Sequence, residues 1–354
     1  MIQKALACFC LLTLSLFSHA NYKLKLVHQD KDIIWGIDFF DSTHLVYSLK
    51  SKGQLVFLNT VNGTSQKLDI PESVAKGQGG LEDVKIYKDH LYFTLTVLEG
   101  DTYTTALAKG KIKDYKISSY QIIFKAKVKS DTGRHFGSRL VFVDDTLFMT
   151  VGDRGERKYA QDLDVHNGKV LRLDLNGQAI SSNPFSTKPN ALREIFSYGH
   201  RNPQGLSYNA NTKTLFEAEF GPRGGDELNI IEPGKNYGWP VITYGKEYWG
   251  PKIGEKRKEG MEQPLVHWTP SISPSGMDFY HNAAIKEFKD QLFMAALGSE
   301  HVRRIVVKDN KVVSQNKMFE KLKERFRQVR NGPDGYLYFT TDSGKIFKLI
   351  SQTK

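Results

Sequence analysis

Cysteine is nearly absent from this chain of 354 residues, in which the only two cysteines are Cys8 and Cys10. After the N-terminal segment there is also no apolar run long enough to cross a bilayer as a helix, which takes about 20 residues. Apolar residues seldom recur with helical spacing. These absences exclude a disulfide framework and membrane-spanning helices, and they favour a soluble chain built mainly from strands.

The first 20 residues have the pattern of a signal peptide. Lys4 gives a positive start, an apolar run follows, and Ser18-His19-Ala20 places small side chains at the two positions that signal peptidase reads. We expect cleavage before Asn21, which leaves residues 21–354 as one domain without cysteine. A thiolate metal site is then excluded as well, and an exported protein, periplasmic or secreted, is expected.

The positive charge of the chain does not indicate a nucleic-acid partner. The formal net charge is +11, and loss of Lys4 with the signal peptide leaves +10 (11 − 1). The densest basic stretches, residues 256–258 and 321–330, lack an RNA- or DNA-binding motif, and the other basic residues are spread thinly. We therefore expect a small-molecule ligand, with neither nucleic acid nor membrane insertion.

A short strand pattern, an apolar and aromatic core followed by threonine or a small residue, recurs along the chain. Its six copies are His44–Ser48, His90–Thr94, Thr146–Thr150, Thr214–Ala218, Gln291–Ala295 and Tyr336–Thr340. The leucines of the copies are 46, 56, 68, 77 and 45 residues apart. Because propeller repeats are about 40–50 residues long, the copies predict an all-β, six-bladed β-propeller with inserted loops on the active-site face. A β-sandwich would also supply short strands, but it needs no such periodic unit.

Polar residues and glycines concentrate in four segments, at residues 77–83, 133–140, 197–206 and 219–229, the last continued at 236–240. His135 titrates near neutral pH and lies in a turn before a strand, so it is a candidate general base. Arg201, Asn202 and Gln204 offer fork and amide donors that can clamp a carboxylate or an oxyanion. These residues also have structural interpretations, as a hydrogen-bonded turn histidine and as a tie between blades.

The last of these segments contains an all-oxygen set of candidate metal ligands. Glu219, Asp226 and Glu227 lie close in sequence to the loop carbonyls of Gly221 and Pro222. Hard cations such as calcium prefer oxygen ligands, including backbone carbonyls. A plain turn is the alternative interpretation of this stretch.

Taken in order, these segments resemble the soluble PQQ-dependent sugar dehydrogenases, in particular the bacterial aldose sugar dehydrogenase branch. The resemblance extends from about Trp35 to the C-terminus. It is most specific in the motifs GHRNPQG at 199–205, GPRGGDELN at 221–229 and NYGWP at 236–240. The family is a six-bladed propeller, in agreement with the repeat.

The resemblance implies catalytic roles for two residues. His135 corresponds to the base that takes the proton of the C1 hydroxyl of an aldose, while the C1 hydride passes to PQQ and a lactone forms. Arg201 corresponds to the arginine that polarises the quinone oxygen and holds the cofactor. The implied cofactors are PQQ and calcium, and the implied substrate is a sugar.

The resemblance also implies a set of binding residues. The PQQ contacts are His135 and Arg201 themselves together with Gln78, Asn202, Gln204, Arg325 and Arg327. The carbonyls of Gly221 and Pro222 correspond to ligands of the calcium beside PQQ, and Glu227 and Tyr237 to ligands of a structural calcium. An arginine-rich pocket suits PQQ because this cofactor carries three carboxylates.

One departure from the family pattern bears on the function. Many members have a lysine that contacts PQQ after an Ala-Leu pair in the fifth blade, whereas Ala296-Leu297 is followed here by Gly298. Two alternatives therefore stay open, a propeller that binds carbohydrate or protein without turnover and a metal-dependent lactonase. We expect a monomer or a homodimer, and the electron acceptor is not readable from the sequence.

Overall fold

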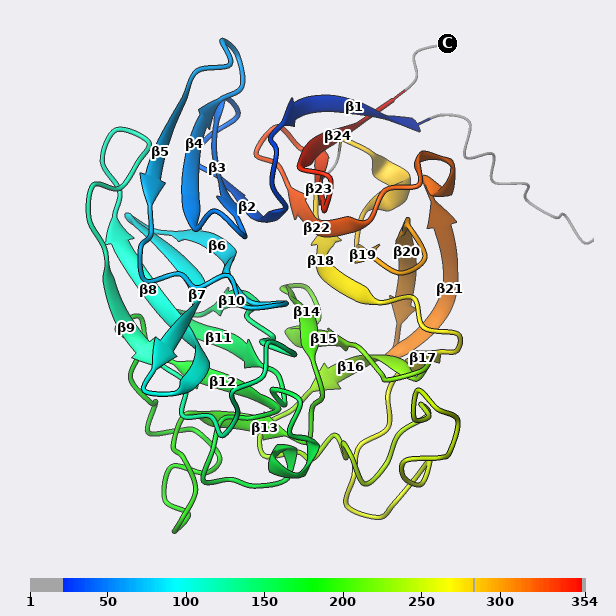
Figure 1. Cartoon of the computed structure of the whole chain (residues 1–354). Coiled ribbons are helices and arrows are strands. Elements are labelled where there is room, and N and C mark those ends of the chain that lie inside the picture. Colours follow the sequence, from blue (N-terminus) through cyan, green and yellow to red (C-terminus); the bar gives the residue numbers. More distant parts are fainter. Residues whose placement is uncertain (1–21, 283, 352–354) are drawn as a thin grey trace, which may run out of the picture.

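The computed structural model describes residues 22–282 and 284–351, which form six four-stranded antiparallel sheets around one axis (Figure 1). Each sheet is one blade, and the chain passes from blade to blade around the ring. The predicted six-bladed β-propeller is therefore confirmed. The expected signal peptide and its cleavage site lie outside the described residues. In that described part, no helix has the length and apolar character needed to span a membrane.

The two inner strands of each blade are the strand at the axis and its neighbour, which contains the repeated pattern. The innermost strands are β2 (Ile34–Phe39), β6 (Leu81–Tyr87), β10 (Leu140–Val143), β14 (Pro203–Asn209), β18 (Pro274–Tyr280) and β22 (Phe326–Asn331). The second strands are β3 (His44–Leu49), β7 (His90–Glu99), β11 (Thr146–Val151), β15 (Thr214–Glu219), β19 (Gln291–Ala296) and β23 (Leu337–Thr341). The six copies found in the sequence thus fall on the second strand of each blade.

The two outer strands complete each blade. The third strands are β4 (Gln54–Asn59), β8 (Thr102–Lys111), β12 (Lys169–Leu173), β16 (Asp226–Ile231), β20 (His301–Lys308) and β24 (Lys345–Ser351). The outermost strands are β5 (Ser65–Asp69), β9 (Gln121–Lys125), β13 (Ile195–Tyr198), β17 (Val266–Trp268), β21 (Lys311–Met318) and β1 (Tyr22–Gln29). The remaining elements are the 3₁₀ turns η2 (Arg157–Ala160), η3 (Lys286–Phe288) and η4 (Glu320–Leu322).

The ring is closed by strands from the two ends of the described chain. β1 pairs antiparallel with β24, with Tyr22 opposite Ser351 and Leu24 opposite Leu349. Figure 1 shows β1 in blue beside β24 in red. The sixth blade therefore joins the two chain ends, and the innermost strands of the first and last blades, β2 and β22, are in contact.

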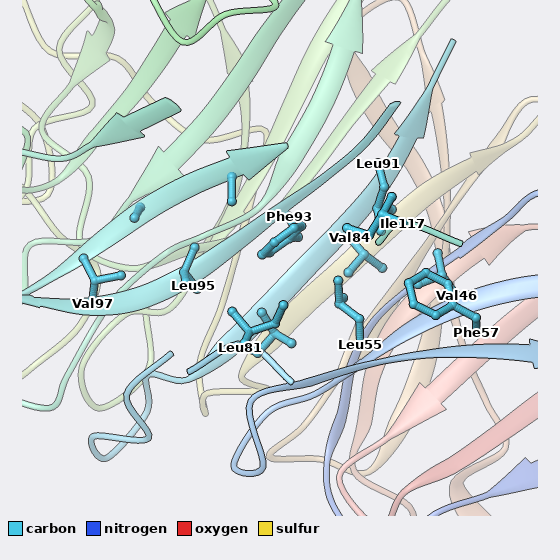
Figure 2. Close-up of a cluster of buried hydrophobic side chains, with 13 residues drawn as sticks. Val46, Leu55, Phe57, Leu81, Val84, Leu91, Phe93, Leu95, Val97 and Ile117 are labelled. Carbon is cyan, nitrogen blue, oxygen red and sulfur yellow. The ribbon is translucent and has the colours of Figure 1, made fainter. Parts of the chain in front are cut away.

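Apolar side chains between neighbouring blades form the core. Figure 2 shows one such cluster, in which Val46 and Phe57 of the first blade pack with Val84 and Phe93 of the second. Burying one side chain of this kind contributes about 1.5–3 kcal/mol. At the axis the blades approach still closer, because a Cβ atom at Gly36 would lie 2.7 Å from the backbone nitrogen of Val84.

The direction of the innermost strands positions the functional residues. Residues just before four of these strands line one cavity, and residues at or near their C-terminal ends line another. The two cavities therefore lie at opposite ends of the ring axis. Loops that enter the innermost strands present their side chains to the first cavity, on a rigid support.

Candidate active site

A cavity of about 780 Å³ lies where the innermost strands begin. Six of the predicted site residues line it: Gln78, His135, Arg201, Asn202, Gly221 and Pro222. They come from loops that are far apart in sequence, so the fold brings together the polar segments singled out above. The long connection between β16 and β17 adds Tyr244, Lys246 and Tyr248 to the wall.

His135 is held in a strained backbone conformation by its neighbours. Its φ of 54° lies in the left-handed region, which non-glycine residues seldom adopt. Its backbone N–H donates to Oε1 of Gln78 at 2.8 Å, and its Nδ1 lies 2.6 Å from Oδ1 of Asp153. Within the described chain, Nε2 has no hydrogen-bond partner. The ring is thus anchored on one side and free to accept a proton on the other.

Asp153, which the sequence analysis missed, is the anchor of that histidine. Its side chain is 2 % exposed, its Oδ2 accepts from Nε1 of Trp239 at 2.8 Å, and its backbone N–H donates to the carbonyl of Arg201 at 2.7 Å. Burial opposes its ionisation, but His135 and Arg201 nevertheless hold the pKa of Asp153 below its ordinary value. The signal in the sequence was the polar turn Gly152-Asp153-Arg154-Gly155 that follows β11.

The electrostatics keep His135 neutral. Burial lowers its pKa, and Arg201 and Arg154 lower it further, while Asp153 acts in the opposite direction. The net shift is downward, so the imidazole is uncharged near neutral pH. With Nδ1–H directed at the Asp153 carboxylate, Nε2 carries the free lone pair, as a general base requires.

The side chain of Arg201, which lines the cavity, is held in place by backbone carbonyls. Its Nη1 donates to the carbonyl oxygens of Phe220 and Gly221, each at 3.0 Å, and its guanidinium carbon lies 5.4 Å from the centre of the Trp239 ring. Its backbone N–H donates to the carboxylate of Glu219. These contacts therefore hold the guanidinium of Arg201 in one orientation.

Three predicted cofactor contacts do not line this cavity. Gln204 accepts a hydrogen bond at 3.0 Å from Nη1 of Arg327, whose Nε donates to Asp342 at 2.9 Å. Arg325 also donates to Asp342, at 3.0 Å, and its Nη1 reaches the carbonyl of Leu297 at 3.2 Å. These side chains form a layer beside the cavity, with Asp342 at its centre.

Gly298 is explained by close packing. A Cβ atom there would lie 2.6 Å from Oγ of Ser273, which itself lines the cavity and has a φ of 55°. The N–H of Leu297 donates to the carbonyl of Ser273 at 2.9 Å, which holds the two segments together. A side chain at position 298 would therefore require the hydroxyl of Ser273 to move.

A cluster of buried acids lies behind Arg201. Glu219 and Glu227 are directly opposite each other on β15 and β16, and Glu217 is opposite Asn229. Like charges in that arrangement repel. Burial raises the pKa of Glu217 and of Glu227 well above the ordinary value, and the charge of Glu219 adds to both shifts. The cluster needs protons or a cation to balance it.

The room for a cation is present beside this cluster. A cavity of about 10 Å³ is lined by Glu219, Glu227 and Tyr237, together with Gly221, which is about the room that one water molecule or ion occupies. The Tyr237 hydroxyl donates to the carbonyl of Ile230 and accepts from a backbone N–H, so its backbone carbonyl is the oxygen left to offer. Oxygens alone make up this donor set, as calcium prefers.

His200 widens the choice of ligands at the same place. Its Nδ1 lies 3.2 Å from Glu219 and 3.9 Å from Glu217, and these three residues can direct their ligand atoms at one point. Oε1 of Glu217 has no hydrogen-bond partner in the described structure. Neither His200 nor Glu217 is recognisable as a metal ligand in the sequence, because one is part of the GHRNPQG motif and the other is an ordinary strand residue.

Comparison with known proteins identifies the family of the chain. Residues 31–348 match the model of the family described as Glucose / Sorbosone dehydrogenase. The chain belongs to that family. The predicted resemblance is thus confirmed, and with it the prediction that the chain is a sugar dehydrogenase.

Individual relatives of this glucose and sorbosone dehydrogenase member cover nearly its full length. The aldose sugar dehydrogenase YliI of Escherichia coli (strain K12) is 37 % identical over 345 residues, which are 93 % of each protein. The structure of the soluble aldose sugar dehydrogenase of Escherichia coli in the apo-form has a TM-score of 0.89 and 36 % identity, covering 94 % of this chain and all of that one. The structure of the PQQ-bound aldose sugar dehydrogenase of Streptomyces coelicolor has a TM-score of 0.78 and 25 % identity, covering 94 % and 98 %.

Proposed function

We propose that this family member oxidises an aldose at C1 to the lactone, with PQQ as the redox cofactor and calcium as its metal. The observation that carries the proposal is the 2.6 Å contact between His135 and Asp153 at the edge of a cavity that Arg201 also lines. The PQQ-bound relative from Streptomyces coelicolor supports the cofactor. The pattern of the first 20 residues supports action outside the cytoplasm.

The charge of the cavity wall fits PQQ. The lining residues of the described chain include the cations Arg201, Arg223 and Lys246 and contain no carboxylate. A cofactor with three carboxylates is attracted to such a wall, and the amides of Gln78 and Asn202 add hydrogen-bond donors. Arg325 bonds the carbonyl of Leu297, so it is a cation next to the position where other members have lysine.

Two metal sites are proposed. The carbonyls of Gly221 and Pro222 belong to residues of the cofactor cavity, so a calcium ion held there would lie within it. Glu227 and Tyr237, with Glu219, would hold a second, structural calcium in the small cavity. The raised pKa values of Glu217 and Glu227 support this second site, because a bound cation would relieve their repulsion with Glu219.

The side chains then divide the work as follows. Nε2 of His135 takes the proton of the C1 hydroxyl, and the Asp153 carboxylate stabilises the imidazolium that results. Trp239 fixes Asp153, and Gln78 fixes the backbone of His135. Arg201 supplies positive charge on the cofactor side of the cavity. Bound PQQ supplies the hydride acceptor, which no side chain of the protein provides.

Both alternatives lack a comparable observation. A metal-dependent lactonase needs carboxylates that converge on a metal inside the substrate cavity, and the described wall has none. A propeller that only binds its ligand does not need a neutral histidine paired with a buried aspartate. The dehydrogenase interpretation uses both features.

The proposal is tested on purified protein freed of cofactor. PQQ is titrated with and without calcium by absorbance, and reduction of an artificial electron acceptor is followed with a panel of aldoses. We expect saturable PQQ binding and calcium-dependent turnover, with the lactone as the product seen by NMR. A protein that does not bind PQQ overturns the proposal.

A single variant tests the base. His135→Ala should still bind PQQ, through the contacts that remain, and lose turnover, because the proton acceptor is removed. Wild-type turnover in this variant would exclude His135 as the base and leave the cofactor assignment standing.

A further inference from the structure

A second cavity, of about 540 Å³, lies at the opposite end of the ring axis, where the innermost strands end. The innermost strand of every blade contributes a residue to its wall: Asp38, Lys85, Phe142, Tyr208, Asp278 and Arg330. Its volume is in the range of ligand-binding cavities, about 300–1,000 Å³. Nothing in the proposed dehydrogenase chemistry uses it.

The charged groups of this cavity are mostly paired with one another. Arg330 donates to both carboxylate oxygens of Asp38, at 3.0 and 3.2 Å, and lies 3.6 Å from Asp278. Asp38 also accepts the N–H of Ile86 at 2.7 Å, and Asp278 accepts the N–H of Asn331 at 3.1 Å. This group of three carries a net charge of −1.

Lys85 is the charged residue of this cavity that has no paired partner. Its positive charge balances the net charge of −1 on the Asp38–Arg330–Asp278 group without direct contact. Only 4 % of the residue is exposed, and it lines the cavity. Yet no hydrogen bond and no ion pair within 4 Å connects its ammonium to any described residue. Its Nζ is not one of the fully buried polar atoms that lack a partner, so the ammonium faces the cavity, where its three donors are open to solvent or to a ligand. Burial, with Arg330 next, lowers its pKa to about 8.

The remaining wall combines aromatic rings with amide groups. The rings of Phe39, Tyr87, Phe142 and Tyr208 line the cavity, and those of Tyr87 and Phe142 stack with centres 4.3 Å apart. The amides of Asn282 and Asn331 stand among them. Aromatic faces with a few amide and charged groups match the apolar faces and hydroxyls of a sugar ring.

We propose that this cavity is a second binding site, for a neutral saccharide whose hydroxyl oxygens accept from Lys85. A neutral ligand is favoured over an anion, because Lys85 and the Asp38–Arg330–Asp278 group already sum to zero charge. Hydroxyls supply the missing acceptors without adding charge. The site is separate from the catalytic cavity and does not depend on its chemistry.

The probe is trehalose, a sugar with no free C1 hydroxyl, which the proposed reaction cannot consume. Binding is measured by calorimetry and by saturation-transfer NMR on the wild type and on Lys85→Met. We expect saturable binding that Lys85→Met weakens at least tenfold and that His135→Ala leaves unchanged. Binding lost in His135→Ala but kept in Lys85→Met would place the sugar in the catalytic cavity and overturn the proposal.

Controls address folding and general charge. Lys88→Met removes an exposed lysine three residues further on, which pairs with Asp145, and it should bind trehalose as the wild type does. Tyr208→Ala removes a wall of the cavity without changing charge and should also weaken binding. Thermal melting checks that each variant is folded. Binding of acetate or phosphate in place of trehalose, or of no probe at all, contradicts the proposal.

Discussion

Nδ1 of His135, in the loop before β10, lies 2.6 Å from Oδ1 of Asp153, in the loop after β11. The pair makes one nitrogen a donor and leaves the other as a base. The buried carboxylate therefore decides which tautomer faces the cavity, and its role is to position His135.

Asp153→Asn should lower kcat by about 10²–10⁴-fold, because the imidazole loses both its tautomer preference and the stabilisation of its charged form. PQQ affinity by absorbance should change little. The exposed Asp164→Asn serves as the matched control. A kcat within twofold of the wild type would remove Asp153 from the mechanism.

The pH profile gives a second readout of the same pair. His135 must be neutral to act, so kcat/KM rises with pH through its pKa and then levels. Burial places that pKa below the ordinary 6.5, so the acid limb should lie below 6.5. Asp153→Asn removes an attraction for the imidazolium and should move the limb lower still. A limb that moves upward contradicts this electrostatic assignment.

The acid cluster predicts opposite effects of one substitution with and without metal. Glu227→Gln removes repulsion with Glu219 and should raise the melting temperature of chelator-treated protein. It should also reduce the stabilisation by added calcium, which for the wild type is about 2.7 kcal/mol at one hundred times the Kd. Glu232→Gln, at an exposed position, should change neither. Equal calcium responses in both variants would mean that the small cavity is not the site.

Glu82, which is buried on β6, predicts how the stability of the fold depends on pH. Burial raises the pKa of Glu82 to about 7, while Ser138 donates to its carboxylate at 2.5 Å. Between about 4.5 and 7 the folded chain keeps a proton that the unfolded chain loses, so the free energy of unfolding falls as pH rises through this window. The total is up to about 3 kcal/mol.

Urea unfolding at several pH values measures this term by difference. Glu82→Gln should flatten the profile between pH 4.5 and 7 relative to the wild type, whereas Glu259→Gln, at an exposed position, should leave it unchanged. Identical slopes for the wild type and Glu82→Gln would show that Glu82 does not titrate in this window.

Packing between blades predicts that removing one aromatic side chain, that of Phe93, causes a large loss of stability. Phe93 is fully buried in the cluster of Figure 2. Phe93→Ala should reduce the free energy of unfolding by about 3–5 kcal/mol, measured by denaturant titration. Val61→Ala, at a side chain that is 76 % exposed, is the control and should change it by less than about 0.5 kcal/mol.

The contact between Gly298 and Ser273 predicts that the single substitution Gly298→Lys will not improve PQQ binding. Gly298→Lys should lower the melting temperature and leave PQQ affinity no higher, because its Cβ meets Oγ of Ser273. Adding Ser273→Gly removes that hydroxyl and also suits the positive φ. The double variant should then bind PQQ more tightly than the wild type. Unchanged affinity in a folded double variant would show that no cation is missing.

The sequence predicted the parts of this molecule that repeat or cluster along the chain. The second strand of each blade recurs, so six copies sufficed for the ring, and the glycine-rich loops that hold His135 and Arg201 stood out from the strands. Asp153 did not, because its partner is 18 residues away and only the hairpin brings them together.

Pairing across blades is the part that the sequence could not supply. The resemblance assigned Arg325 and Arg327 to the cofactor, but it could not show that Asp342 already pairs with both. Lys85 is one lysine among many in the sequence. Its isolation appears only when the six innermost strands are placed around the axis.

The pairing of β1 with β24 also determines when the sixth blade can form during synthesis. Synthesis produces β1 before β24, so the sixth blade cannot assemble until β24 has been made. Long-range pairing of this kind is slow, and the waiting strand edge is open to wrong partners. In this propeller, the edge of β1 therefore stays unpaired until β24 is available to cover it.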